Sequence, residues 1–469
     1  MEATIKDRIK AYFEEQKEAM LADIIDIVAM RSVKGEPEPG MPFGRELAQV
    51  VEHTEQLAHR LGLSTKNFDN YVLTVNLNDK PTELGIFAHL DVVHEGTGWT
   101  TPPYEPDIRD GKIFGRGVAD DKGPAVAALY ALKAVKDLGI ELSKNVRVIL
   151  GTDEESGSGD LPYYFERECP PPYSFSPDAA YPVYNIEKGR FQGTFTSQYK
   201  DNGALPRVVR IEGGHTMNIV AQKAEALIEG MAVEEIERIC REMAADMKVE
   251  LTVVQEGDFV RLTVTGASAH ACDPAAGNNA NTAILAMLAA LPLAESEGKQ
   301  RICSLARLFP HGDYFGKALG IQMEDKVSGP LTCSFDILRY DAAQLSGSID
   351  CRCPVCSNEE NTSEVADRWL SECDLHLETT KMVAPHYVPE DLPFIQTLLR
   401  AYEEYTGMKG ECWAMGGGTY VHGIENAVAF GACYPYTDVR GHAADEFAVI
   451  EELMVSAQLF TQIIIDMCR

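Results

Sequence analysis

Residues 124–150, PAVAALYALKAVKDLGIELSKNVRVIL, predict a helix followed by a strand. Small and apolar residues fill Pro124–Leu138, where the proline at the first turn and Gly139 after the last turn are typical start and stop signals. The apolar run Val146–Leu150 predicts a buried strand, and Leu84–Leu90 predicts another before the helix. Strands separated by helices favour an α/β fold with an open, mostly parallel sheet and helices on both faces.

The same alternation continues towards both ends of the chain. A helix is predicted at Ile5–Val28 and a strand at Tyr71–Leu77. Near the other end, Ala427–Tyr434 predicts a strand and Val449–Met467 a closing helix. We therefore expect one discontinuous domain built from residues 1–187 and 384–469.

The middle of the chain, residues 188–383, has a different pattern. Short runs of alternating apolar and polar residues are interleaved with helical patterns, which indicates an inserted antiparallel α+β domain. The insertion is long enough to hold two copies of one smaller unit. The predicted strands are Arg207–Ile211, Phe259–Val264 and Leu331–Leu338, and the predicted helices are Asn218–Met231 and Asn281–Ala290.

The composition excludes several classes of protein. The 469 residues include 42 basic and 72 acidic ones, a net charge of −30, and so offer no overall basic surface for nucleic acid or for an anionic membrane. The longest apolar run, Thr282–Ala294, is shorter than a spanning helix and contains a proline. The charged opening MEATIKDRIKAYFEEQKE has no apolar core of the kind found in signal peptides, and we predict a cytoplasmic protein.

The twelve cysteines are scattered, which is typical of reduced thiols in a long chain. Cys351, Cys353 and Cys356 form one local cluster that could hold a metal through its thiolates. The cluster lacks a second paired C-x-x-C motif to complete a tetrahedral site, so we favour buried thiols there.

Candidate ligands follow the predicted strands. His89 and Asp91 come at the end of the strand Leu84–Leu90 and point to one face, which is either a metal ligand with its orienting carboxylate or a buried polar pair. Asp120, in the glycine-rich segment 115–123, either caps the following helix or bridges two metal ions. The acids Asp153-Glu154-Glu155 follow the next strand, and their mutual repulsion indicates a function.

Two further stretches add to this set. Asp178 ends another strand candidate, and residues 441–446, GHAADE, carry His442. Ligands of open α/β sheets bind beyond the carboxyl ends of the strands, so these residues are expected to converge. Imidazoles and carboxylates suit Zn²⁺, Mn²⁺ or Co²⁺, and two such ions would form a hydrolytic site.

Taken together, FAHLDVV at 87–93, GRGVADDKG at 115–123 and TDEESGS at 152–158 resemble the M20 family of co-catalytic metallopeptidases. The long insertion and GGGTY at 416–420 are similar to its PepV-type dipeptidases. The resemblance implies a zinc-peptidase-like catalytic domain and an inserted lid domain with two pseudo-equivalent halves. It further implies two divalent metal ions, for which zinc is the favoured metal and manganese and cobalt are alternatives. It also implies that the peptide bond after Asp120 is cis.

The resemblance assigns roles to individual residues. Glu154 is expected to be the general base, and Asp91 is expected to orient a metal-binding histidine. From the lid, His270 is expected to donate a hydrogen bond to the developing oxyanion, although a lone histidine is more often structural. The implied metal ligands are His89, Asp120, Asp178, Glu155 and His442, and the implied substrate-binding residues are Arg352, Asn218, Gly417 and Gly418.

The expected function is hydrolysis of dipeptides by a cytoplasmic monomer with a small peptide as its substrate. Arg352 presents donors suited to a substrate carboxylate, although it could equally be an ion-paired side chain. A lid that holds this carboxylate at a fixed distance from the metals would select dipeptides by length. Two alternatives remain open: an N-acyl amino-acid deacylase of the same fold, and a metal-binding protein without turnover.

Overall fold

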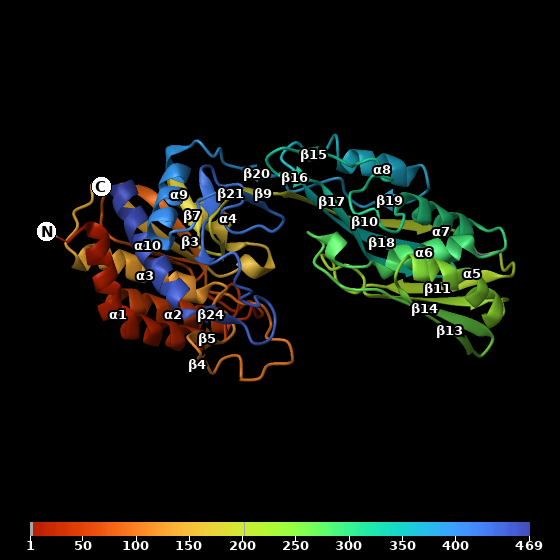
Figure 1. Cartoon of the computed structure of the whole chain (residues 1–469), viewed down its shortest axis with the longest axis horizontal. Coiled ribbons are helices and arrows are strands. Elements are labelled where there is room, and N and C mark those ends of the chain that lie inside the picture. The colour runs from red at the N-terminus through yellow and green to blue at the C-terminus, as the bar shows by residue number, and fades with distance from the viewer. Residues whose placement is uncertain (1–2, 201) are drawn as a thin grey trace. The chain divides into compact units, whose positions relative to one another are not determined.

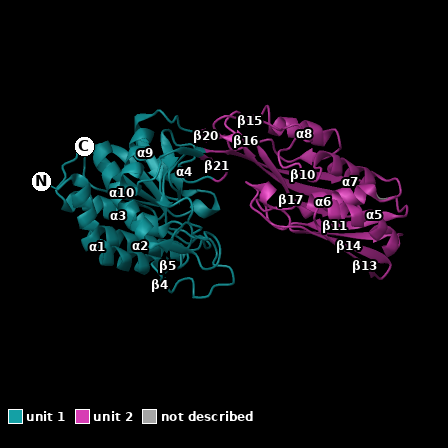
Figure 2. Ribbon diagram, viewed as in Figure 1, with its two compact units in different colours: residues 1–186, 387–413, 418–469 teal, residues 187–386, 414–417 magenta. Residues whose placement is uncertain are grey.

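The computed structural model describes residues 3–200 and 202–469 (Figure 1). Their contacts divide the chain into two units, shown in Figure 2: Met1–Ile186, Tyr387–Trp413 and Gly418–Arg469 form the first, and Glu187–His386 with Ala414–Gly417 form the second. The boundary after residue 186 lies one residue from the predicted boundary, and the boundary after residue 386 lies three residues from the predicted one. The sequence did not predict that residues 414–417 belong with the insertion.

The larger sheet has nine strands in the order β1-β2-β6-β3-β7-β22-β9-β20, with β21 beside β9. Its four central strands, β6, β3, β7 and β22, run parallel, whereas β1 and β2 are antiparallel additions at one edge. The strands are β1 (Ser64–Phe68), β2 (Val72–Asn76), β3 (Thr82–His89), β6 (Asn145–Gly151), β7 (Tyr173–Ser176), β9 (Val183–Glu187), β20 (His386–Tyr387), β21 (Cys412–Met415) and β22 (Ala427–Ala429).

Apolar side chains alternate between the two faces of this sheet. In β3, Ile86 and Ala88 belong to the large core, whereas Phe87 belongs to a smaller core on the opposite face. The large core contains residues of α1 (Ile5–Val28), α2 (Arg45–Arg60), α3 (Lys122–Asp137), α9 (Pro393–Thr406) and α10 (Ile450–Cys468). The smaller core contains residues of α4 (Asp160–Phe165) and the turn at 420–424. The predicted parallel sheet with helices on both faces is confirmed.

Smaller strands complete the first unit. The predicted strand Ala427–Tyr434 is wrong in length, because it breaks at Gly431, whose φ is 75°, into β22 and β23 (Ala432–Cys433). β23 pairs in parallel with β8 (Ala179–Ala180). A three-stranded sheet joins β4 (Asp107–Arg109), β5 (Lys112–Phe114) and β24 (Phe447–Val449).

The second unit is an antiparallel eight-stranded sheet in the order β13-β14-β12-β11-β17-β18-β10-β19. Its strands are β10 (Gly189–Gln198), β11 (Arg207–Gly213), β12 (Lys223–Glu229), β13 (Glu250–Glu256), β14 (Phe259–Thr265), β17 (Thr332–Tyr340), β18 (Gln344–Cys353) and β19 (His376–Leu377). Its helices are α5 (Val233–Asp246), α6 (Ala280–Ala290), α7 (Glu297–Leu308) and α8 (Ser363–Ser371), and β15 (Glu324–Asp325) pairs with β16 (Gly329–Pro330).

The strand order is symmetric about the contact between β11 and β17. On one side β12 leads through α5 to the outer strand β13, and on the other side β18 leads through α8 to the outer strand β19. Two equivalent halves joined along their central strands would give this order.

One predicted helix, Asn218–Met231, is wrong. Residues Lys223–Glu229 instead form strand β12, which is paired on both sides by β11 and β14. Alternate side chains, Ala224, Ala226 and Ile228, are buried. Alanine, leucine and glutamate favour helices, but pairing with two neighbouring strands and burial of one face outweigh that local preference.

Among the described residues, no helix is both long enough and apolar enough to cross a membrane.

Candidate metal centre

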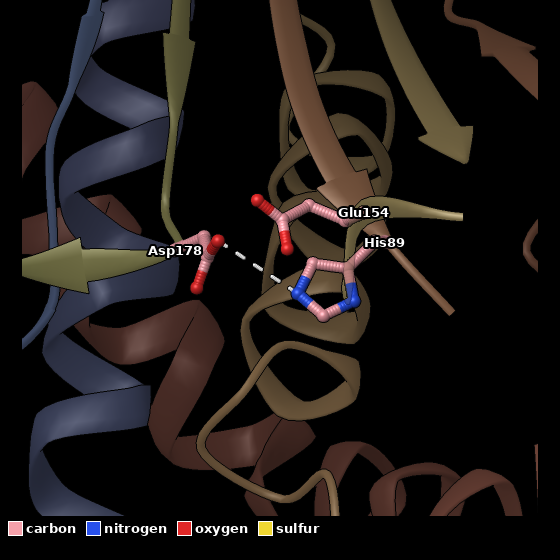
Figure 3. A group of neighbouring side chains, drawn as sticks. All are labelled: His89, Glu154 and Asp178. Atoms are coloured by element: carbon pink, nitrogen blue, oxygen red, sulfur yellow. Dashed lines mark ion pairs between the residues drawn. The ribbon is translucent and has the colours of Figure 1, made fainter. Parts of the chain in front are cut away.

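The candidate ligands gather at one edge of the parallel sheet because they follow neighbouring strands. His89 is the last residue of β3, Glu154 begins a short 3-10 helix after β6, and Asp178 lies two residues beyond β7. Carboxyl ends of parallel strands meet at the same edge, which brings these side chains together. Ligand atoms of His89, Glu154 and Asp178 lie within 4.8 Å of one another (Figure 3), and the same holds for ligand atoms of His89, Asp120 and Glu155.

His89 is fully buried and held in one orientation. Its Nδ1 lies 2.9 Å from the main-chain oxygen of Asp91, which can only accept a hydrogen bond, so Nδ1 carries the proton. In the neutral ring this leaves Nε2 with its lone pair directed at the acidic cluster, 3.0 Å from Asp120 Oδ1 and 3.7 Å from Asp178 Oδ2. This geometry leaves the lone pair of His89 Nε2 available to a cation.

Asp120 faces both candidate histidines. Its Oδ1 lies 3.0 Å from Nε2 of His89, and its Oδ2 lies 3.0 Å from Nε2 of His442. His442 also lies 3.1 Å from Glu155 Oε2. Helix α3 begins at Lys122 with Asp121 as its N-cap, so Asp120 is not the cap. The bond between Asp120 and Asp121 is cis, as the resemblance implies.

Asp91 holds the turn that carries the two glutamates. Its Oδ1 accepts a hydrogen bond from the N–H of Glu154 at 3.2 Å, and its Oδ2 accepts one from the N–H of Glu155 at 3.0 Å. The carboxylate lies farther from His89 Nδ1, at 3.4 Å, than the Asp91 main-chain oxygen does. Asp91 therefore positions His89 and the glutamates together.

The carboxylates of the cluster are perturbed by burial and by one another. Burial, with the charges of Glu155 and Asp120, raises the pKa of Glu154 to about 8. Burial and the Asp120 charge raise the pKa of Asp178 well above its usual range. The pKa of Asp120 itself falls, because its hydrogen bonds to His442 and His89 outweigh the effect of burial.

Both histidines respond to these carboxylates. Hydrogen bonds to Asp120 and Glu155 raise the pKa of His442 to about 10. Burial opposes protonation of His89, but its contacts with Asp120 and Asp91 outweigh burial and raise its pKa. The cluster therefore attracts positive charge, as a site for cations does.

A buried ion pair that the sequence did not single out supports the loop around Asp120. Glu446 Oε2 accepts a hydrogen bond from Arg116 Nη1 at 2.6 Å, and the pair is 0% and 2% exposed. Glu446 Oε1 accepts hydrogen bonds from the N–H groups of Gly117 and Ala119, both at 3.0 Å. Residue 446 lies in the motif quoted for His442, but only the fold shows what it contacts.

Asp160 and Tyr420 were also missed, and they support the turn after β6. Asp160 Oδ2 accepts a hydrogen bond from the N–H of Thr152 at 2.6 Å and from the Tyr420 hydroxyl. The Tyr420 ring meets His89 edge-on, with 6.2 Å between the ring centroids. Tyr420 belongs to the motif GGGTY at 416–420, but nothing in the spacing of the sequence predicts its contact with Asp160.

The second unit brings His270 and Asn218 together. The N–H of Ala271 donates to the main-chain oxygen of Asn218 at 2.8 Å, and Ile219 pairs with His270 in an isolated bridge. The N–H of Cys272 donates to His270 Nδ1 at 3.1 Å, so the neutral ring carries its proton on Nε2. That form makes Nε2 a hydrogen-bond donor.

Arg352 is also in the second unit, and it is ion-paired there. Its Nε lies 2.6 Å from Asp350 Oδ1 and its Nη2 lies 3.2 Å from Asp350 Oδ2, while Nη1 donates to the Gly416 oxygen. This hydrogen bond places Gly416 beside Arg352, and Gly416 and Gly417 belong to the second unit, whereas Gly418 belongs to the first. The pair with Asp350 fixes the guanidinium and leaves part of its donor set for another acceptor.

Two of the three clustered cysteines, Cys351 and Cys353, lie in the core of the second unit. Cys333, Cys351 and Cys353 are buried among its apolar side chains, and Cys356 is exposed. Cys333 and Cys351 face each other across β17 and β18. All twelve cysteines are free thiols.

Comparison with known proteins identifies the family. The sequence pattern described as Peptidase family M20/M25/M40 matches residues 85–466. The chain belongs to this family. It is accordingly a hydrolase of peptide bonds of the metallopeptidase class, as the resemblance predicted, and the match includes every candidate ligand.

Two relatives cover almost the whole of this M20 peptidase. YtjP of Bacillus subtilis (strain 168), provisionally named a dipeptidase, is 35% identical over 461 residues, which cover 97% of this chain and 98% of that protein. The Beta-Ala-Xaa dipeptidase of Lactobacillus delbrueckii subsp. lactis is 31% identical over 465 residues, with 98% of both chains covered. The crystal structure of human carnosine dipeptidase 1 has the same fold, with a TM-score of 0.61, 15% identity and 99% of both chains covered.

Proposed function

We propose that this M20 peptidase is a dipeptidase that works with two divalent cations. One observation carries the proposal: the two oxygens of Asp120 each lie 3.0 Å from Nε2 of a different histidine, His89 or His442. A carboxylate placed in this way can bridge two ions, each of which one imidazole also binds. The name of the Lactobacillus relative supports dipeptides as substrates.

The donor set fits two such ions. Asp178 Oδ2 lies 3.7 Å from Nε2 of His89 and would share one ion with His89 and Asp120. Glu155 Oε2 lies 3.1 Å from Nε2 of His442 and would share the other ion with His442 and Asp120. Buried carboxylates whose pKa values are raised, as those of Glu154 and Asp178 are, gain stability in the ionised form when cations lie beside them. Imidazole nitrogens with carboxylate oxygens favour Zn²⁺, with Mn²⁺ or Co²⁺ as alternatives.

When bound, the two cations would polarise the scissile carbonyl group and lower the pKa of a water molecule. Glu154 is the proposed general base: its carboxylate takes a proton from the attacking water and returns it to the leaving amine. Asp91 contributes by positioning, because it fixes His89 through its main-chain oxygen and the Glu154–Glu155 turn through its carboxylate. The assignment of Glu154 as the general base and Glu155 as a metal ligand follows the family resemblance.

We propose for residues of the second unit the roles that the family resemblance implies. His270 would donate a hydrogen bond from Nε2 to the developing oxyanion, consistent with the tautomer that Cys272 favours. Arg352, fixed by Asp350, would bind the carboxylate of the substrate, with Asn218, Gly417 and Gly418 assisting. Residues 1–187 and 384–469 would be the catalytic domain, and 188–383 the lid. We also propose that the protein acts as a cytoplasmic monomer.

A matched substrate set tests the function. Protein stripped of metal and reloaded with Zn²⁺ or Mn²⁺ is given a dipeptide, its N-acetylated form and the corresponding tripeptide. We expect the dipeptide alone to be cleaved. Preference for the acetylated compound would assign the chain to the deacylases instead, and no turnover with either metal would contradict the enzymatic proposal.

Glu154→Gln tests the assignment of the base. The amide cannot take up the proton, so we expect kcat to fall by roughly 10²–10⁴-fold. Two metal ions per chain should remain by elemental analysis, because the ligands are unchanged. Glu166→Gln is the matched control, since that side chain is 74% exposed and away from the cluster. A variant that keeps more than a tenth of the activity would contradict the role of Glu154.

A further inference from the structure

A cavity of about 250 Å³ adjoins the candidate metal centre within the first unit. Asp120 and Asp178 line it, but His89, Glu154, Glu155 and His442 do not, so the cavity lies to one side of the cluster. Its walls come from the paired strands β8 and β23 and from the first turns of helices α3 and α10. The cavity is therefore a separate space that touches two of the proposed ligands.

The walls combine apolar surface with negative charge. Ala180 and Cys433 face the cavity from β8 and β23, and Leu453 faces it from α10. Three acids, Asp120, Asp178 and Glu452, are among the residues that line it, and none of the described lining residues is a lysine, arginine or histidine. Glu452 is already satisfied, because its oxygens accept hydrogen bonds from the Tyr434 N–H at 2.8 Å and from the Thr437 hydroxyl at 2.6 Å.

We propose that this cavity binds the side chain of the substrate's amino-terminal residue and selects apolar side chains over acidic ones. This inference rests on the proposed dipeptidase function. In a dipeptide, the α-carbon of the amino-terminal residue is bonded to the carbonyl carbon under attack, so its side chain must lie beside the metal ligands. The apolar side chains of the walls cannot solvate a carboxylate, and Glu452, a lining acid outside the proposed metal ligands, adds a negative charge.

The size of the cavity sets the range of side chains. A cavity of roughly 150 Å³ is enough to hold a benzene molecule, so the space beside Asp178 accommodates leucine and phenylalanine side chains. An aspartate side chain would lose its hydration among the apolar side chains of the walls, and none of the described lining residues is a basic side chain that could pair with it. The cavity therefore favours uncharged residues at the amino-terminal position.

Wild-type enzyme gives the first test, by steady-state kinetics with Leu-Gly, Phe-Gly, Asp-Gly and Gly-Leu. We expect kcat/KM for Leu-Gly and Phe-Gly to exceed that for Asp-Gly by at least tenfold, since one apolar group in a fitted pocket is worth about 10–200-fold. Gly-Leu serves as the reference because it sends no side chain into the cavity. Equal rates for Leu-Gly and Asp-Gly would overturn the inference.

A filling variant gives the second test. Ala180 is partly exposed in the cavity wall, so Ala180→Leu places additional carbon atoms in the space, whereas Ala180→Ser leaves the volume nearly unchanged. We expect Ala180→Leu to lower the ratio of kcat/KM for Phe-Gly to kcat/KM for Gly-Leu at least tenfold, and Ala180→Ser to leave this ratio unchanged. Cys433→Met fills the cavity from the neighbouring strand β23, and we expect it to have the same effect if Ala180→Leu does not fold.

The outcomes separate the two proposals. If wild-type enzyme cleaves no dipeptide, the proposed function fails. If it cleaves Gly-Leu normally but the filling variants leave the ratio of Phe-Gly to Gly-Leu unchanged, only the cavity inference is overturned. Equal losses for Phe-Gly and Gly-Leu would likewise overturn it, because they would show a general defect of the site.

Discussion

Removal of the Glu446 carboxylate tests how the loop around Asp120 is held. In Glu446→Ala, the guanidinium of Arg116 loses the partner that lies 2.6 Å from its Nη1. The N–H groups of Gly117 and Ala119 lose their acceptor at the same time. All these groups stay buried or partly buried, so water cannot fully replace the carboxylate.

The size of the effect follows from burial. Breaking a buried ion pair by removing one partner costs about 3–5 kcal/mol, because the remaining charge is left uncompensated. Arg116 keeps a hydrogen bond to the main-chain oxygen of Ala443 at 3.2 Å, which limits the loss. We therefore expect the free energy of unfolding to fall by about 4 kcal/mol, a large part of the ~5–15 kcal/mol typical of a folded domain.

Urea unfolding followed by tryptophan fluorescence and circular dichroism measures this change. Glu38→Ala is the control, because it removes an ion pair of similar length, 2.9 Å to Arg45, whose side chains are 42% and 64% exposed. Exposed pairs contribute about 0–1 kcal/mol, so the control should barely move the urea midpoint. Glu446→Gln retains an oxygen for the two N–H groups but loses the charge, and its midpoint should fall between those of the other variants.

A loss in Glu446→Ala no larger than that in Glu38→Ala would refute the reasoning. It would show that Arg116 and the two N–H groups find other partners, and that burial of the pair does not control the stability of the loop. A loss of metal binding without any loss of stability would also contradict the argument.

Three further predictions concern metal, packing and pH. Adding Zn²⁺ or Mn²⁺ to metal-stripped protein should raise its thermal midpoint, by the equivalent of about 2.7 kcal/mol at a hundredfold excess over Kd, and an unchanged midpoint would argue against a metal site. Gly151→Ala would place a Cβ 2.0 Å from the Tyr420 hydroxyl and 2.4 Å from Asp160 Oδ2, so we expect the free energy of unfolding in urea to fall by roughly 1–3 kcal/mol. Gly35→Ala is the control, with an expected loss of less than about 1 kcal/mol, because its Cβ would lie 3.7 Å from Gly44 Cα, an ordinary contact distance. Burial raises the pKa of Asp336 to about 7, so the folded chain keeps this proton at pH values where the unfolded chain has lost it. The free energy of unfolding should therefore fall as the pH rises from about 4 to 7, by up to ~1.4 kcal/mol per pH unit. Equal dependence of this free energy on pH in wild type and Asp336→Asn would refute the prediction.

The sequence alone determined the central sheet and the set of candidate ligands. Apolar runs and helix signals are local, and they placed β3, α3 and β6 within a few residues of their observed bounds. Ligands that follow successive parallel strands must meet at one edge, so the grouping of His89, Glu154 and Asp178 followed from strand order.

Only the tertiary structure decided how those ligands are oriented and supported. Asp120 faces both His89 and His442, and Glu446 contacts Arg116 across 330 positions of sequence. Segment 223–229 became a strand for the same reason, since β11 and β14 lie on either side of it. Such contacts join residues that are distant in the chain, and local propensity and spacing carry no information about which distant groups will share a buried site.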